Sequence, residues 1–258
     1  MICPNLNKEI LHKGWDKMNR RFISVLLLSF FLLTLLTSCT FADADVDFST
    51  AGQLAKNSLK PDERILYLTE DGRYTPYYIV SAYNNDFSLL LRKDILSTDL
   101  SFSSDGNGYY AESPIDLYLN SDFLNLFPDS VNNLIQDTDI KISCRFPDTD
   151  NIEEIKRKVF LLSASEVGID VDFVNNEGSR LDFFNDLDNR LAFKDDKPYG
   201  WWLRSAYIID RGLAWHIAAD GTVHGSAVQI PSGIRPAFCI PSSTPIVKDN
   251  NLMGYVLD

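Results

Sequence analysis

The first 39 residues contain the feature that most restricts what this chain can fold into. An almost wholly apolar run extends from Phe22 to Leu36, after Arg20 and Arg21 and shortly before Cys39. A basic flank, a short apolar stretch and small residues behind it are typical of an export signal. We therefore expect residues 1–38 to be removed, so that the folded part comes from the other 220 of the 258 residues.

The residues that end this run, Leu36-Thr37-Ser38-Cys39, resemble the lipobox of bacterial lipoproteins. The resemblance implies that the Cys39 thiol carries diacylglycerol and that the mature chain is anchored to the outer face of a bacterial membrane. Two acyl chains would make such an anchor stable. The alternative is a single transmembrane anchor, but a spanning helix needs about 20 apolar residues, and this run is shorter. We expect the signal to begin at Met18 rather than at Met1.

The composition after the signal is that of a folded, acidic domain. The chain contains 16 Phe, 11 Tyr and 4 Trp, enough aromatic residues for a core, and its formal net charge is −12. This charge repels phosphate groups, so we expect no nucleic-acid partner. We expect a lipidated cysteine and an acidic linker over residues 39–60, a single globular domain over 61–245 and a C-terminal tail over 246–258.

Two cysteines remain within the expected domain, Cys144 and Cys239. In an oxidising compartment they could form a disulfide, and two separate buried thiols are the alternative. A zinc site made from His216, His224 and a cysteine has little support, because the chain has only three histidines and no clustered Cys and His residues. We expect no metal and no cofactor.

Residue patterns predict strands at both ends of the domain and helices between them. Strands and a turn are expected over 65–91, and helical spacing runs over 113–136, with Ser113 as N-cap, Pro114 in the first turn and a break at Pro128. Residues 170–198 are polar and predict a long surface excursion. Further strands are expected over 138–144, 159–162, 199–205, 214–218, 222–230 and 234–240. This order predicts an α+β fold.

Five motifs follow one another along the chain. They are Asp116-Leu117-Tyr118-Leu119-Asn120 with Phe123-Leu124, Val159-Phe160-Leu161-Leu162-Ser163 with Glu166, Trp201-Trp202-Leu203-Arg204-Ser205, Asp220-Gly221, and Ile234-Arg235-Pro236-Ala237-Phe238. Over residues 60–242 this series resembles a bacterial surface family, the domain of unknown function 6273. The resemblance implies a C-type-lectin-like fold, related to that of the formylglycine-generating enzymes, with a twisted, mostly antiparallel sheet, a few packed helices and long loops.

The resemblance carries over no catalytic residues. The cysteine pair of the formylglycine-generating enzymes has no counterpart in the contexts of Cys144 and Cys239, and no GxSxG, phosphate loop or Ser-His-Asp order stands out. Members of the family often have proline where this chain has Ala206, which affects only the expected local loop shape.

Arg204 and Arg235 each lie inside an apolar stretch, where a guanidinium is costly unless it is paired. One interpretation is a clamp for an anion or carboxylate ligand. The other, which we favour, is a structural bridge to Glu166, to Asp220 or to loop carbonyls, because five donors in a planar fork suit buried cross-linking.

Trp202, Trp215 and Tyr207 are the candidates for stacking against a ligand. Adjacent residues of a strand face opposite sides, so at least one of Trp201 and Trp202 is expected in the core. Acidic residues of the 170–198 stretch favour a solvated face over a calcium site, since no EF-hand spacing occurs; they are Asp170, Asp172, Asp182, Asp186 and Asp188.

Three functions fit these observations. The first is a non-catalytic, membrane-anchored domain whose loops between residues 168 and 215 bind a surface glycan or protein. The second is an enzyme acting on cell-wall material or glycans, with Glu166 or Asp220 as base. The third is a structural protein of the envelope. A carboxylate pair with a strongly shifted pKa in a pocket would favour the enzyme, and a flat aromatic patch would favour binding.

Overall fold

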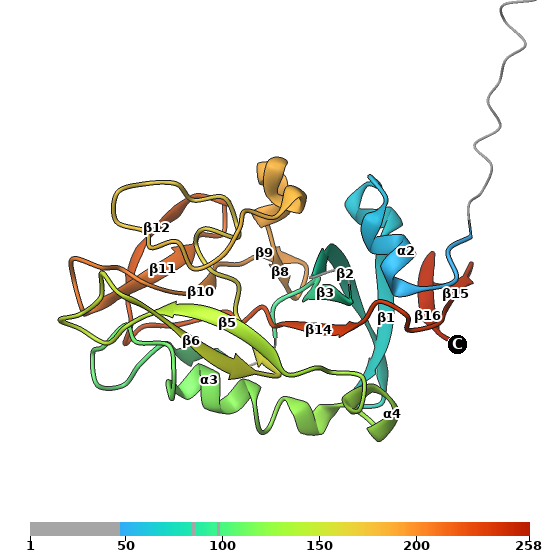
Figure 1. The fold of residues 1–258 in the computed structure, drawn as a ribbon, viewed down its shortest axis with the longest axis horizontal. Helices are drawn as coiled ribbons and strands as arrows, with labels where there is room; N and C mark the ends of the chain where they lie inside the picture. The colour runs from blue at the N-terminus through green and yellow to red at the C-terminus, as the bar shows by residue number, and fades with distance from the viewer. Residues whose placement is uncertain (1–46, 84–85, 97–98) are drawn as a thin grey trace, which may run out of the picture. The chain divides into compact units, whose positions relative to one another are not determined.

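A seven-stranded sheet organises the folded part of the chain (Figure 1). The computed structural model describes residues 47–83, 86–96 and 99–258, so Cys39 and the expected export signal lie outside the described residues. Neighbouring strands of the sheet are antiparallel except β1 and β16, which are parallel. In spatial order the strands are β15 (Ile246–Asp249), β16 (Gly254–Leu257), β1 (Ile65–Glu70), β2 (Arg73–Tyr83), β3 (Phe87–Arg92), β14 (Ala237–Pro241) and β7 (Val159–Phe160).

The turn expected at residues 70–73 joins β1 to β2. Glu70 pairs with Arg73, which leaves Asp71 and Gly72 as a two-residue loop with φ angles of 49° and 72°. Positive φ at both positions is the type I′ hairpin geometry, which favours the Asp-Gly dipeptide. The local sequence therefore sets the register of the first hairpin.

Smaller sheets flank the large one. A three-stranded sheet contains β10 (Trp201–Ala206), β11 (Leu213–Ile217) and β12 (Val223–Ala227). Three pairs of strands complete the fold: β4 (Leu100–Ser101) with β13 (Pro231–Ser232), β5 (Thr138–Ser143) with β6 (Ile152–Arg157), and β8 (Phe193–Lys194) with β9 (Lys197–Pro198).

Helices are few and short in the described residues. The α-helices are α2 (Ala51–Lys56), α3 (Pro114–Leu119) and α4 (Asp129–Asn132), and the 3-10 turns are η1 (Pro61–Glu63), η2 (Leu124–Leu126), η3 (Asp182–Asn185) and η4 (Leu187–Arg190). The expectation of a C-type-lectin-like α+β fold is therefore wrong as a fold class, because a large mixed sheet and small sheets make the described structure mostly β. No described helix has the length and apolar character needed to cross a bilayer.

The helical spacing of residues 113–136 gives three short pieces instead of long helices. Ser113 caps α3 as expected, since its side-chain oxygen accepts a hydrogen bond from the Asp116 backbone N–H. The helix already ends at Leu119, because the Asn120 side chain turns to β7, donates to Val159 O at 2.9 Å and accepts from the Val159 N–H at 3.2 Å. A tertiary contact thus replaces further helical turns.

The folded unit extends from Asp47 to Asp258, so it includes residues 47–60 of the expected linker and the whole of the expected tail. In the segment expected as a linker, α2 packs on β2 and β3. Gly52 lets α2 also lie against the residue that follows β14, since a Cβ at Gly52 would lie 2.6 Å from that of Ser242. In the segment expected as a tail, β16 pairs with β1.

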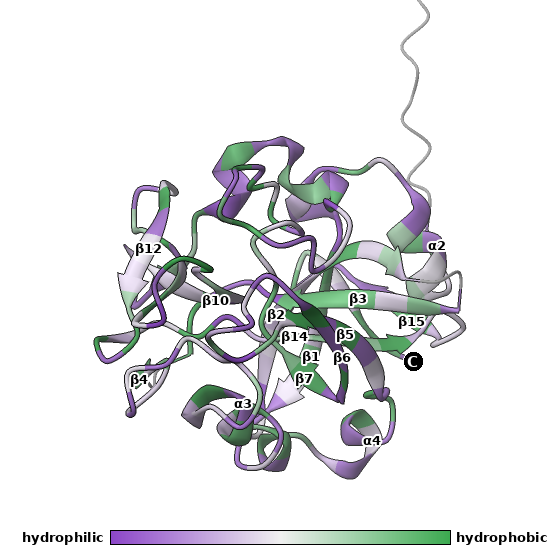
Figure 2. Ribbon diagram, turned by 60° about the vertical axis from the view of Figure 1, so that its left-hand side comes forward, coloured by the Kyte–Doolittle hydropathy of each residue, from purple (hydrophilic) through white to green (hydrophobic). Residues whose placement is uncertain are grey.

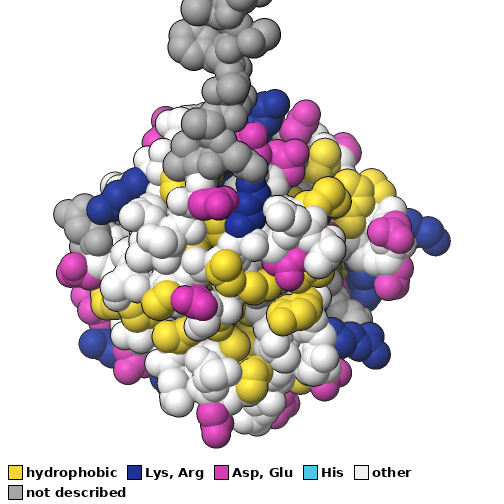
Figure 3. All heavy atoms as spheres, turned by 90° about the vertical axis from the view of Figure 1, so that its right-hand side faces the viewer, with side chains coloured by type: hydrophobic (Ala, Val, Ile, Leu, Met, Phe, Trp, Pro, Cys, Tyr) yellow, Lys and Arg dark blue, Asp and Glu magenta, His cyan; other side chains and the backbone are white. Residues whose placement is uncertain are grey.

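Hydrophobic residues concentrate on the strands at the centre, and the loops around them contain more of the hydrophilic residues (Figure 2). The strand β14 lies between β3 and β7, and its residues from Ala237 to Ile240 are fully buried. Figure 3 shows the side of the molecule at the right of Figure 1. Hydrophobic side chains on this side are interrupted by backbone, by uncharged polar groups and by a few charged side chains, and more charged side chains lie toward the edge of the view. Such interrupted apolar surface is normal for a folded domain.

Candidate functional site

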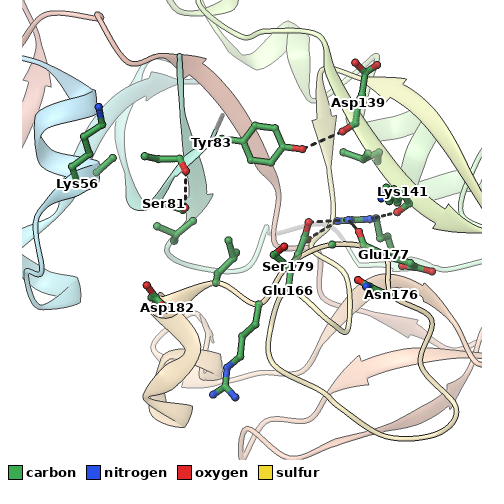
Figure 4. A pocket seen from close by; sticks show the side chains of 18 of the residues that line it. Lys56, Ser81, Tyr83, Asp139, Lys141, Glu166, Asn176, Glu177, Ser179 and Asp182 are labelled. Carbon is green, nitrogen blue, oxygen red and sulfur yellow. Dashed lines mark hydrogen bonds and ion pairs between the residues drawn. The ribbon is translucent and has the colours of Figure 1, made fainter. Parts of the chain in front are cut away.

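A cleft of about 880 Å³ lies between β2, β5, the end of α2 and the loop of residues 176–182 (Figure 4). Its size falls in the range usual for small-molecule sites, about 300–1,000 Å³. The loop belongs to the 170–198 stretch that the sequence predicted as a surface excursion. Arg204 and Glu166, two residues singled out in the sequence, line this cleft together.

Arg204 forms a complete set of hydrogen bonds below this cleft and is 1% exposed. Its Nη1 and Nη2 donate to the two Glu166 carboxylate oxygens at 2.6 and 2.9 Å. The other three N–H groups donate to the backbone oxygens of Lys141, Leu161 and Glu177 at 2.7–2.9 Å. Burial lowers the pKa of Arg204, but the Glu166 charge and hydrogen bonds outweigh it and raise this pKa above its usual value. The arginine therefore links β5, β7 and the 176–182 loop.

A second carboxylate, Glu177, lies beside this pair and is almost fully buried. Its Oε1 accepts the Ser143 backbone N–H at 2.8 Å and the Ser143 hydroxyl at 2.5 Å. Its Oε2 accepts the Ser205 hydroxyl at 2.5 Å. Burial raises the pKa of Glu177, while Arg204 and the serine donors act in the opposite direction. Both carboxylates are thus held by donors of the protein itself.

The walls of the cleft are polar and carry both signs of charge. Tyr83 crosses from β2 toward β5 and donates its hydroxyl to the Asp139 carbonyl oxygen at 3.1 Å (Figure 4). The basic residues that line the walls are Lys56, Arg64, Lys141 and Arg180, and the acidic ones are Asp139, Glu154 and Asp182. This lining suits a ligand with many hydrogen-bonding groups better than an apolar one or a polyanion.

Arg235 lies elsewhere and has a different environment. It is fully buried, its Nε donates to Arg92 O at 3.0 Å and its Nη1 to Asn189 O at 3.3 Å. Its Nη2 has no hydrogen-bond partner, and its guanidinium carbon lies 5.1 Å from the centre of the Trp201 ring. Burial lowers the pKa of Arg235 to about 10. In the described part of the chain this arginine forms no ion pair with a carboxylate. Of the expected structural bridges, Arg235 therefore forms the one to backbone carbonyls.

The tryptophans proposed for ligand stacking are core residues. Trp202 is fully buried, because both sides of β10 are covered, and it packs edge-on against Phe102. Trp215 is 5% exposed and packs against Tyr207, with ring centroids 5.0 Å apart. Of the three candidates only Tyr207 is partly exposed. It is covered on one side by Phe173, an exposed aromatic that the sequence analysis did not single out.

Cys144 and Cys239 are free thiols. Cys239 lies in β14 and forms an isolated antiparallel β-bridge with Gln136, whereas Cys144 follows β5. The bridge places Cys239 beside the start of β5, and Cys144 lies just beyond the other end of this strand. The extended chain from residue 138 to 144 covers about 20 Å at roughly 3.3 Å per residue, far more than the Cα separation of a disulfide. The thiol of Cys239 is buried, which raises its pKa to about 12. The disulfide alternative is therefore wrong, and the cysteines are separate.

The other acidic candidates lie outside this arrangement. Asp220 is on the β11–β12 turn, where its Oδ1 accepts two hydrogen bonds from Thr222, and these bonds lower its pKa. It does not line the cleft that contains Arg204. Asp186 caps η4 by accepting the Asp188 N–H. Across residues 47–83, 86–96 and 99–258, no three His, Cys, Asp or Glu side chains gather in a way that could hold a metal ion.

Sequence reasoning missed Glu177, because its donors come from residues far away along the chain. One local signal was available. Gly178 follows it, and a Cβ at Gly178 would lie 2.8 Å from Glu166 Oε1. A glycine after an acid within a polar stretch can mark a close approach of backbone to a charged group.

Comparisons with known proteins identify the family of this chain and nothing further. Searches of curated proteins and of solved structures found no match. A family model described as a domain of unknown function, DUF6273, matches residues 85–242. This match confirms the resemblance drawn from the order of the motifs, although it begins later than residue 60. It covers more than half of the chain, which therefore belongs to the DUF6273 family.

Proposed function

We propose that this chain is an exported, lipid-anchored protein of a bacterial envelope that binds a polar ligand in the cleft without catalysing a reaction. The observation that carries the binding part is the cleft of about 880 Å³ with its charged and polar lining, and the state of the two carboxylates carries the absence of catalysis. Every oxygen of Glu166 and Glu177 already accepts a hydrogen bond from the protein. A general acid or base must exchange its proton with a substrate, whereas each of these oxygens is already engaged by a donor of the protein.

The location rests on the sequence alone. The apolar run before Cys39 predicts export and acylation. Cells that express the full chain and are fed labelled palmitate should incorporate the label, and Cys39→Ala should abolish this incorporation. Recovery of the intact, unprocessed chain from the soluble intracellular fraction would contradict the location.

Binding assays with the full-length chain in detergent can show which class of ligand the cleft binds. We expect binding on a glycan array or to envelope polymers in a pull-down, because hydroxyl and amide groups match the mixed charges of the cleft. Silence in both assays would favour a structural role in the envelope over binding.

One observation favours the alternative, an enzyme acting on cell-wall material or glycans. A buried acid with a raised pKa next to an arginine is a common property of catalytic sites, and Glu177 has it. If the chain is an enzyme, it should release soluble fragments from purified cell walls, and Glu177→Gln should stop the release while leaving binding intact. The binding proposal predicts no release from either protein.

A further inference from the structure

The second sheet brings two of the three histidines of the chain together. His216 on β11 and His224 on β12 are directly paired across the strands, so their side chains share one face of the sheet. Their ring centroids are 5.4 Å apart, with an angle of 55° between the rings. His216 is 8% exposed and His224 is exposed.

The hydrogen bonds around His216 fix which nitrogen carries its proton. Its Nε2 lies 2.7 Å from the Ser232 hydroxyl oxygen, and this hydroxyl donates to Gly200 O at 3.2 Å. A serine has one hydroxyl hydrogen. Both bonds exist together only when His216 Nε2–H donates to Ser232. The lone pair of the imidazole is then on Nδ1.

This Nδ1 is buried and has no hydrogen-bond partner. An unpaired acceptor in the interior has a free-energy cost of about 1–3 kcal/mol, so the unpaired Nδ1 needs a physical reason. The ring is buried, and burial favours the neutral imidazole over the charged form. A neutral imidazole with one N–H anchored to an oxygen and the other nitrogen unpaired is the usual state of a metal-binding histidine.

We propose that His216 and His224 form a two-histidine site for a divalent transition-metal ion such as Zn²⁺, with His216 Nδ1 as one ligand. Two imidazoles bound to one zinc ion at about 2.0–2.1 Å and a near-tetrahedral angle place their ring centroids roughly 5 Å apart. The observed separation is 5.4 Å. Water completes the coordination, since the described residues hold no third His, Cys, Asp or Glu ligand there. His224, being exposed, moves to admit the ion.

This site departs from the expectation that the protein binds no metal. From the sequence, a zinc site made of His216, His224 and a cysteine had little support, because the chain has only three histidines and no clustered Cys and His residues. The site is distinct from the cleft, which neither histidine lines, so it stands independently of the proposed function. Ser232 acts as a positioning residue that sets the tautomer of His216.

Ring ¹⁵N NMR of the full-length chain tests both parts, because the chain has only three histidines. Without metal, His216 should show the Nε2–H tautomer. Addition of Zn²⁺ should shift the ring signals of His216 and His224. His224→Gln, a change at an exposed position, should weaken Zn²⁺ binding at least about tenfold. Ser232→Ala should give a mixture of tautomers and weaker binding.

The matched control is Lys197→Gln, a change to the same residue at an exposed position away from both histidines, which should leave the Zn²⁺ affinity unchanged. The proposal is overturned if His216 has the Nδ1–H tautomer, or if His224→Gln binds Zn²⁺ as tightly as the wild type. Equal losses in the Lys197 and His224 variants would show only adventitious binding and would also reject the site.

Discussion

Two buried arginines, Arg204 and Arg235, lie in regions of the interior that differ in the partners they offer to a guanidinium. Around Arg204 every guanidinium N–H has an acceptor, and Glu166 supplies a carboxylate that binds through both oxygens. Around Arg235 two backbone carbonyls and the face of Trp201 are the partners, and Nη2 has none. Both side chains are equally hidden from solvent.

The pKa directions follow this difference. The pKa of Arg204 is raised, because the Glu166 charge outweighs the cost of burial, while burial lowers the pKa of Arg235 to about 10. Breaking an ion pair leaves the partner charged and buried, whereas removing an arginine held by carbonyls leaves only neutral acceptors. The comparison predicts unequal costs for the same substitution in the two regions.

The largest effect is expected for Arg204→Met. The change leaves Glu166 and Glu177 without their cationic partner, so the free energy of unfolding should fall by about 3–5 kcal/mol. Urea unfolding measures the loss, and Lys141→Met, an exposed change on the neighbouring strand, is the control. A variant that unfolds at the same urea concentration as the wild type would show that Arg204 has no structural role.

A smaller loss is expected for Arg235→Met. Arg92 O and Asn189 O lose their donors, which should cost about 1–3 kcal/mol because no carboxylate is left uncompensated. The same urea experiment gives the value. If Arg235→Met destabilises the protein as much as Arg204→Met, the distinction between the two regions fails.

The smallest expected effect is a pH dependence of the free energy of unfolding, which tests the description of the Arg204 region. Because burial raises the pKa of Glu177 in the folded state above its ordinary value of 4.5, the folded protein holds this proton more tightly than the unfolded chain. Stability should therefore gain a contribution as pH falls from neutral toward 4.5. Glu177→Gln should lack it. Unfolding curves of both proteins between pH 7 and 5 measure the difference, and parallel pH profiles would show that Glu177 titrates normally.

Local chemistry was sufficient to predict several parts of this fold. The Asp71-Gly72 turn and the Ser113 cap depend on neighbouring residues. The burial of Arg204 followed from its place in an apolar strand, and Glu166 was among its predicted partners.

The remainder depends on long-range contacts that a single sequence does not display. The strand β6 alternates between partly buried and exposed residues and was not predicted, because its apolar content is low and its partner is β5. The parallel pairing of β16 with β1 joins opposite ends of the chain. Trp202 looked available for a ligand only because the packing of Phe102 over it was unknown. Glu177 receives its donors from Ser143 and Ser205.

Binding in the cleft is the central claim, and a charge reversal tests it most directly. The full-length Lys141→Glu variant should bind the glycans or envelope polymers retained by the wild type at least about tenfold more weakly, on the order of 1.4 kcal/mol, because Lys141 is exposed and lines the cleft. Lys197→Glu, an identical change at an exposed position that does not line the cleft, should bind normally. Equal affinity of the two variants would contradict the cleft as the binding site.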